Sequence, residues 1–327
     1  MAEQSLVLAP LPWQREQWSL VQSLLERERL AHGLLLHGTA GVGKGQLARL
    51  LALRLLCESP RHGLPCGECH ACSMFAAGSH PDFFLASAAY GTSEDDDDGK
   101  SRKGRKTATT SRQIRIDCIR DLIHFSHQAA HQGGRRVAII EPAEWLNRNA
   151  QNALLKTLEE PGAGLFIILV SHEPSRLLAT TRSRCQALLC PTPERLDALE
   201  WLRHHVAVDR AESALAFCHG APLKALAAVH DDLDLLHREV MLTLEACRQD
   251  EVTYLFAAEQ LARHDAAMVF DWWYGLLHRL CCARPAAALL HFTDQLLEAR
   301  RKALGTANPN TRLLLESLLI DWAQLPA

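Results

Sequence analysis

Apolar positions follow two different periods over the first 190 residues. Continuous apolar runs of four to six residues, typical of buried strands, occur at 33–37, 82–86, 137–140 and 165–170. Around these runs apolar residues recur at helical spacing, in the segments 13–30, 43–57, 114–130 and 149–160. Strands that alternate with helices predict a parallel sheet covered by helices on both faces.

Beyond residue 191 the strand signals stop. Three short helical units follow, at 194–206, 211–219 and 222–230, and every long segment after 231 has a helical period: 233–247, 252–264, 267–283, 286–303 and 311–325. The sequence therefore predicts an α/β domain over 1–190, a small three-helix domain over 191–230 and an all-helical domain over 231–327.

Residues 90–112 interrupt the α/β pattern with an acidic block, then a basic block, and no aliphatic residue larger than Ala. This composition predicts a solvated, disordered loop insertion. The alternative is a basic patch that contacts DNA, formed by Lys100, Arg102, Lys103, Arg105 and Lys106.

The composition is that of a globular protein. The chain has 327 residues, of which 48% are hydrophobic and 22% charged, with a formal net charge of -3. These values exclude wholesale disorder, collagen and coiled coil. No apolar run reaches the ~18 residues of a membrane span, and residues 1–12 lack a signal-peptide pattern, so we expect a soluble, cytoplasmic protein. The small net charge indicates that any DNA contact is shared with partners.

A glycine loop at 38–45 fits the phosphate-binding pattern except at its last position. Gly38, Gly41 and Gly43 let backbone amides turn inward around phosphate oxygens, and Lys44 would reach the outer phosphates. The eighth residue should be Ser or Thr, whose hydroxyl holds Mg²⁺, but here it is Gly45. A glycine-rich turn without any ligand is the alternative.

A second departure from a working ATP-hydrolysis site follows the apolar run at 137–140. Glu141 could be the acid on the metal side, but Pro142 occupies the place of the carboxylate that would position water. Proline can neither polarise water nor donate a hydrogen bond. The sequence therefore predicts an ATPase fold that no longer hydrolyses ATP.

Four of the eleven cysteines cluster as Cys57, Cys66, Cys69 and Cys72. In a cytosolic chain this spacing favours metal over disulfides, and four thiolates suffice for a closed tetrahedral zinc site. An iron–sulfur cluster and free thiols are the alternatives. His70 is expected to face solvent. The other seven are expected in apolar cores: Cys118, Cys185, Cys190, Cys218, Cys247, Cys281 and Cys282.

Two further motifs are the string Asn-Ala-Leu-Leu-Lys-Thr-Leu-Glu-Glu-Pro at 152–161 and Ser183-Arg184-Cys185. With the glycine loop and the four clustered cysteines, they make the chain resemble the clamp-loader subunits of bacterial DNA polymerase III, in the AAA+ superfamily. The resemblance covers nearly the whole chain. Gly45, Pro142 and the string at 78–84 make it most similar to the delta-prime branch rather than to the gamma/tau motor.

The resemblance implies an α/β AAA+ domain with a zinc-binding insert at 57–72, a three-helix lid and an all-α C-terminal collar that oligomerises. It implies a non-hydrolysing stator within a DNA-directed DNA polymerase holoenzyme. The implied partners are the motor (gamma/tau) and wrench (delta) subunits and, through the complex, the sliding clamp and primed DNA. Zinc is the implied cofactor, with weak binding of ATP or ADP in the chain's own loop.

Further roles follow only from the resemblance. Arg184 would act in trans as an arginine finger on ATP bound by the neighbouring subunit. Ser171 and His172 fall where the family senses phosphate, and Leu223 replaces a nucleotide-sensing Arg. In the collar, some of Trp272, Trp273 and Trp322 are expected against neighbouring subunits, with an ordinary core as the alternative.

Two other functions fit parts of the sequence. The chain could be an active AAA+ ATPase motor of the gamma/tau kind, against which Gly45 and Pro142 argue. It could also be a zinc module that binds specific DNA, but it lacks the basic recognition helix expected beside the metal.

Overall fold

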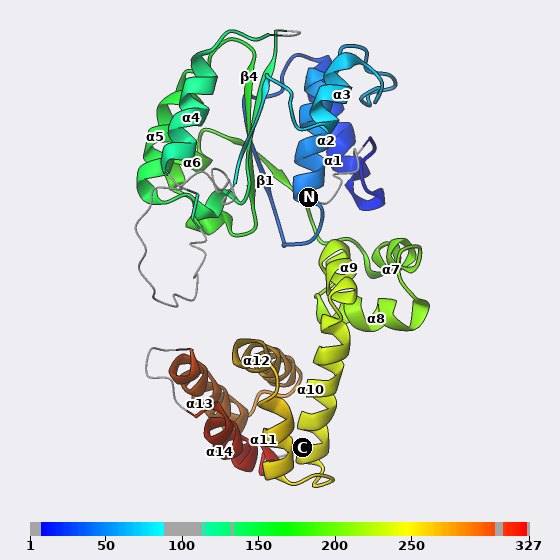
Figure 1. Cartoon of the computed structure of the whole chain (residues 1–327), viewed down its shortest axis with the longest axis vertical. Helices are drawn as coiled ribbons and strands as arrows, with labels where there is room; N and C mark the ends of the chain where they lie inside the picture. The colour runs from blue at the N-terminus through cyan, green and yellow to red at the C-terminus, as the bar shows by residue number, and fades with distance from the viewer. Residues whose placement is uncertain (1–7, 88–112, 115, 132–133, 305–309, 326–327) are drawn as a thin grey trace, which may run out of the picture. The chain divides into compact units, whose positions relative to one another are not determined.

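The computed structural model describes residues 8–87, 113–114, 116–131, 134–304 and 310–325. By its internal contacts the chain divides into two compact units, Met1–Leu226 and Ala227–Ala327 (Figure 1). The insertion predicted at 90–112 lies outside the described residues.

The first unit is built on a parallel sheet, as predicted, and the sheet has five strands. Its strand order is β2 (Phe83–Ala86), β3 (Arg136–Ile140), β4 (Leu165–Ser171), β1 (Gly33–His37) and β5 (Gln186–Leu189). The edge strand β5 was not predicted, because only Leu188 of its four residues is buried and no continuous apolar run marks it.

Helices cover both faces of the sheet (Figure 1). One face carries α1 (Arg15–Glu26), α2 (Lys44–Leu56) and α3 (His70–Ala76), and the other carries α4 (Ile116–His127), α5 (Arg148–Glu159) and α6 (Ala179–Arg182). Short 3₁₀ turns lie at Pro12–Gln14, Ala143–Trp145 and Pro174–Arg176. Each face has its own buried apolar cluster, so the sheet is packed on both sides.

Because the strands are parallel, the glycine loop and Arg184 lie at opposite edges of the sheet. The glycine loop follows β1, Glu141 follows β3 and Ser171 ends β4, so all three lie at the carboxyl edge of the sheet. Arg184 comes just before β5 and therefore lies at the amino edge, where its carbonyl oxygen is 3.0 Å from the position of a Cβ on Gly33. At about 3.3 Å per residue, the five residues of β1 separate the two edges by about 13 Å.

The predicted three helices follow the sheet as α7 (Arg195–Arg203), α8 (Val208–Phe217) and α9 (Pro222–His230). The start of α9 contacts the glycine loop, because the N–H of Leu223 donates to the carbonyl of Gly41 at 3.0 Å. Leu223 thus packs against the loop.

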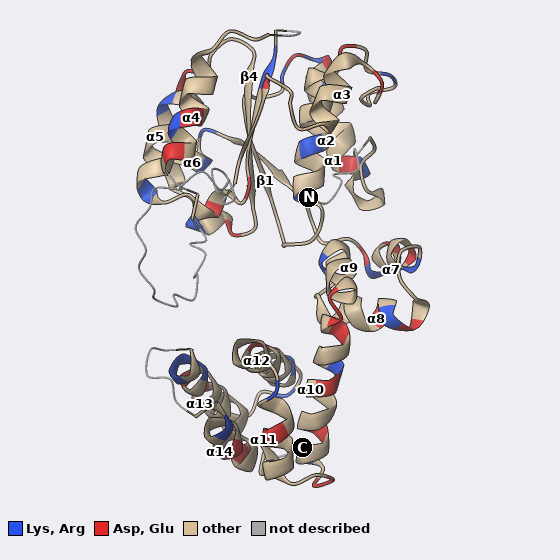
Figure 2. Cartoon of the chain, viewed as in Figure 1, with Lys and Arg blue, Asp and Glu red and all other residues tan. Residues whose placement is uncertain are grey.

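The second unit is helical throughout, as predicted: α10 (Leu233–Arg248), α11 (Tyr254–Leu261), α12 (Ala266–Ala283), α13 (Ala287–Ala303) and α14 (Thr311–Ala323). Lys, Arg, Asp and Glu are spread over the helices of both units in the view of Figure 2. No helix in the described part of the chain is long and apolar enough to cross a membrane.

The core of this unit decides between the two alternatives for two of its three tryptophans. Trp273 and Trp322 are fully buried and pack edge to face, with ring centroids 5.7 Å apart. They belong to the unit's own core and cannot contact a neighbouring subunit. Trp272 is half-buried against the same core.

Candidate functional site

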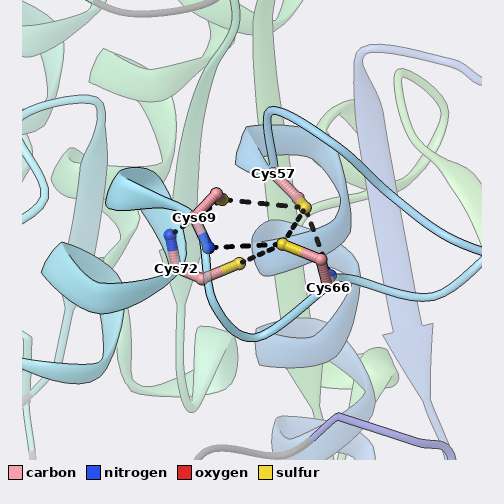
Figure 3. Close-up of side chains that lie close together, drawn as sticks. All are labelled: Cys57, Cys66, Cys69 and Cys72. Carbon is pink, nitrogen blue, oxygen red and sulfur yellow. Dashed lines mark hydrogen bonds between the residues drawn. The ribbon is translucent and has the colours of Figure 1, made fainter.

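The four clustered cysteines meet at the end of α2 and the start of α3 (Figure 3). Cys57 lies 3.6 Å from Cys66 and 4.0 Å from Cys69, and Cys66 lies 3.9 Å from Cys72, all measured between sulfurs. All four sulfurs are within 4.8 Å of one another, so the cluster could hold a metal ion.

These distances fit one tetrahedral ion. A zinc–sulfur bond of about 2.3 Å places neighbouring sulfurs about 3.8 Å apart. In a cluster of several irons the cysteines bind different iron atoms, which would require a wider spacing than this. His70 is exposed and is not part of the group, as expected.

Backbone N–H groups stabilise the negative charge that the cysteine sulfurs carry when they bind a cation. The N–H groups of Cys66, Cys69 and Cys72 donate to the sulfurs of Cys57, Cys66 and Cys69, at 3.3 to 3.5 Å. Hydrogen bonding, first from the backbone at Glu68, lowers the pKa of Cys66 to about 6. Burial raises the pKa of Cys57, so this thiol needs a metal to stay ionised.

The remaining cysteines are only partly as expected. Cys118, Cys190, Cys218 and Cys247 are buried, and Cys185 and Cys281 are half-buried. The prediction was wrong for Cys282, which is exposed in the last turn of α12.

At the carboxyl edge of the sheet the glycine loop is fully formed. Gly38, Gly41 and Gly43 have positive φ angles of 143°, 82° and 88°, which side chains rarely adopt. Lys44 is 2% exposed, and its Nζ donates to the carbonyls of Gly38 at 2.7 Å and Thr39 at 2.6 Å. Burial lowers the pKa of Lys44. The ammonium is therefore fixed across the loop.

Side chains that precede α1 hold the loop from outside. Gln14 is 2% exposed and donates through Nε2 to the carbonyls of Val42 at 3.0 Å and Gly43 at 2.9 Å, and Trp13 Nε1 donates to Val42 at 3.0 Å. Sequence reasoning missed Gln14, because a single polar residue ahead of a helix carries no signal of a contact this far along the chain.

At Gly45 an ion pair fills the corner where a hydroxyl would hold Mg²⁺. A Cβ on Gly45 would lie 2.0 Å from Glu141 Oε1 and 2.9 Å from Arg49 Nη1, while Arg49 Nη2 and Glu141 Oε2 are 2.9 Å apart. The residues present here do not fit Mg²⁺, because a guanidinium already carries the positive charge. The sequence did not reveal Arg49.

Buried polar groups at the carboxyl ends of β3 and β4 lie beside the loop. The N–H of His172 donates to Glu144 Oε1 at 3.1 Å, and Glu144 is 6% exposed. Burial, and then the nearby charge of Lys44, lower the pKa of His172. Ser171 is completely buried. The carboxylate of Glu144, three residues beyond Glu141, is a second acid that sequence reasoning missed.

Arg184 stands apart from these groups, at the amino edge. Its Nε donates to Glu159 Oε1 at 2.7 Å, its Nη1 donates to the Thr180 carbonyl at 2.9 Å, and its Nη2 also pairs with Glu159. The Arg184 side chain remains 33% exposed. Glu159 belongs to the string at 152–161, so that string holds the arginine in a fixed orientation.

Comparison with known proteins finds matches in two parts of the chain. The family model described as "DNA polymerase III, delta subunit" matches residues 13–194, and the one described as "DNA polymerase III, delta subunit, C terminal" matches residues 262–324. The delta' subunit of DNA polymerase III from Pseudomonas aeruginosa is 36% identical, over 96% of this chain and 98% of that protein. The chain belongs to the DNA polymerase III delta' family.

Other relatives include a second delta' subunit and, at lower identity, other subunits of DNA polymerase III. The delta' subunit of Escherichia coli is 34% identical over 68% of this chain and 61% of its own length. The tau subunit of that organism is 28% identical and is covered over 47% of its length. A gamma subunit-related protein of DNA polymerase III from Thermotoga maritima has a TM-score of 0.53 at 16% identity, covering 94% of this chain and 99% of that one, which shows a shared fold.

Proposed function

We propose that this chain is the non-hydrolysing stator subunit of a bacterial clamp loader, which helps to place the sliding clamp on primed DNA. Its partners in this proposal are the motor (gamma/tau) and wrench (delta) subunits. The observation that carries the proposal is the separation of two sites, a damaged nucleotide loop at one edge of the sheet and an exposed, oriented arginine at the other.

The loop lacks what ATP hydrolysis needs. Gly45 offers no hydroxyl, and Arg49 and Glu141 occupy the corner of the metal. Pro142 offers no group to orient water, and Leu223 packs on the loop where a guanidinium would be required. Three defects in one apparatus argue against the alternative of an active motor.

Arg184 serves a neighbouring subunit in this proposal. Because β1 separates the arginine from the loop of its own chain, the guanidinium cannot reach phosphates bound there. It is partly exposed and held by Glu159, so it is suited to stabilise charge on a phosphoryl group across a subunit boundary.

For the cysteines, zinc is the ion we propose. Four sulfurs at tetrahedral spacing leave no open position for substrate, so the ion would fold the insert at 57–72 and take no part in chemistry.

The test uses a clamp loader reconstituted with Arg184→Ala. We expect unchanged assembly but slower clamp- and DNA-stimulated ATP hydrolysis and clamp loading. An arginine finger contributes ~10³–10⁵ in rate at its own site, and the total falls less because other sites keep their arginines. Arg184→Lys should rescue little, because an ammonium lacks the planar fork.

Arg176→Ala is the matched control, since Arg176 is an exposed arginine that also pairs with a nearby acid, Glu173. Wild-type rates with both Arg184 variants would refute the finger. The isolated chain should hydrolyse ATP no faster than its Lys44→Ala variant, and turnover that this substitution abolishes would instead support the motor.

A further inference from the structure

The disagreement between the glycine loop and Mg²⁺ leads to a further inference. The family fold implies a nucleotide bound together with Mg²⁺, but the corner for the metal holds the Arg49 guanidinium. Glu141, the residue expected on the metal side, binds that guanidinium instead, with Nη2 and Oε2 2.9 Å apart. The positive charge of the Arg49 side chain therefore occupies the place where the family fold would bind the Mg²⁺ ion.

The remainder of the loop keeps the features of an anion site. Among the described residues, the N–H groups of Gly41, Gly43 and Lys44 have no hydrogen-bond acceptor. Gly43 is the N-cap of α2, which runs for 13 residues, so the positive end of the helix dipole points into the loop. The buried Lys44 ammonium donates two of its three N–H groups to loop carbonyls, which leaves the third available to a ligand.

Arg49 has donors to spare as well. In the described part of the chain its Nε and Nη1 have no hydrogen-bond acceptor, and its side chain is 31% exposed, so solvent and ligand can reach it. A guanidinium can bind Glu141 with one side of its fork and a phosphate oxygen with the other.

We propose that the loop binds a diphosphate group, of a nucleoside diphosphate or of free pyrophosphate, without magnesium, and that Arg49 supplies the positive charge in place of the metal. The backbone amides and Lys44 hold the diphosphate, while Arg49 reaches the oxygens that Mg²⁺ would otherwise bind. Added Mg²⁺ brings no gain, because the metal would have to displace the guanidinium. No bond is made or broken, which agrees with the proposed absence of hydrolysis.

Calorimetric titration of the full-length chain tests the inference, with ADP and with pyrophosphate, each in magnesium-free buffer without chelator, which leaves the proposed zinc in place, and in excess Mg²⁺. We expect binding without Mg²⁺ to be at least as tight as in Mg²⁺. Binding of ADP but not of pyrophosphate would assign the site to a nucleotide, and equal binding would assign it to the diphosphate alone. Binding that requires Mg²⁺, or no binding of either compound at millimolar concentration, would overturn the inference.

Variants of Arg49 test whether its guanidinium supplies the positive charge that binds the diphosphate. Arg49→Met should weaken binding without Mg²⁺ at least tenfold, while Arg49→Lys, which keeps the charge, should retain part of it. Arg120→Met is the matched control, because Arg120 is also a helical arginine paired with a carboxylate, Asp117, but is exposed on α4. Zinc content and circular dichroism verify folding, and wild-type affinity in Arg49→Met would contradict the proposal.

The inference stands apart from the stator function. Loss of diphosphate binding in Arg49→Met should leave complex assembly and the effect of Arg184→Ala unchanged, since the two residues lie at opposite edges of the sheet. Failure of either proposal is therefore visible without the other.

Discussion

Two buried tryptophans of the second unit offer a matched test of how a polar atom affects its core. Trp322 donates through Nε1 to the carbonyl of Leu244 at 2.8 Å. The Nε1 of Trp273 is equally buried but has no hydrogen-bond acceptor among the described residues. Replacing each ring with Phe removes a similar volume from the same cluster. We therefore expect the two variants to differ through the indole nitrogen.

The size of the difference follows from these contacts. Trp322→Phe loses one buried hydrogen bond, worth about 0.5–1.5 kcal/mol, while the Leu244 carbonyl keeps its place in α10. Arg248 also lies over the Trp322 ring, 5.1 Å from its centroid, and would lose part of that contact. Trp273→Phe removes an unpaired donor whose burial costs about 1–3 kcal/mol. Trp322→Phe should therefore be the less stable variant by about 1.5–4.5 kcal/mol.

Native-state hydrogen exchange on the full chain measures this difference within the unit concerned. The slowest amides of α10 and α14 should exchange faster in Trp322→Phe than in Trp273→Phe, by a factor of ten for each 1.4 kcal/mol. Equal protection in the two variants, or weaker protection in Trp273→Phe, would show that ring packing rather than the indole N–H decides the stability of this core.

Three further predictions concern the first unit. Glu159→Gln removes the negative charge beside Arg184 but keeps an amide oxygen that can accept from its Nε. Since a partly exposed ion pair contributes ~0.2–1 kcal/mol, ATPase of the assembled complex should fall by at most about fivefold, well short of the loss in Arg184→Ala. Elemental analysis should find one zinc per chain, and Cys66→Ser should lose it and unfold the insert, whereas retained zinc would contradict the tetrahedral site. Because burial lowers the pKa of His172, the unfolded chain takes up the proton first, so unfolding free energy should decrease as pH falls below about 6.5; His172→Gln should reduce this decrease in acid titrations of stability.

The sequence predicted those elements whose burial is visible within a short window. The run at 33–37 became β1 because four of its five residues are buried on a sheet packed from both sides. The edge strand β5 and the seven-residue α3 gave no such signal, since each buries few residues. Helical periodicity also predicted the helices of the last unit, but it could not tell whether Trp273 and Trp322 contact their own unit or a neighbour.

The site was predictable where spacing alone defines the chemistry. Four cysteines within sixteen positions have few other arrangements, and the structure brings their sulfurs together. Arg49 and Glu141 were different, because they are far apart in the chain and become partners only when α2 packs beside β3. The same holds for Glu159, whose place in a long matching string gave no hint that it holds Arg184.

The placement of Arg184 and the glycine loop at opposite edges makes the subunit directional. Contacts that join one edge to the other edge of the next chain are heterologous, so they repeat in a row rather than pair off around a twofold axis. In such a row a chain with a working arginine and a non-hydrolysing loop completes the ATP site of one neighbour only. The proposed stator would therefore have a single permitted position, at an end of the series of active sites, and its polarity would fix the order of the subunits around it.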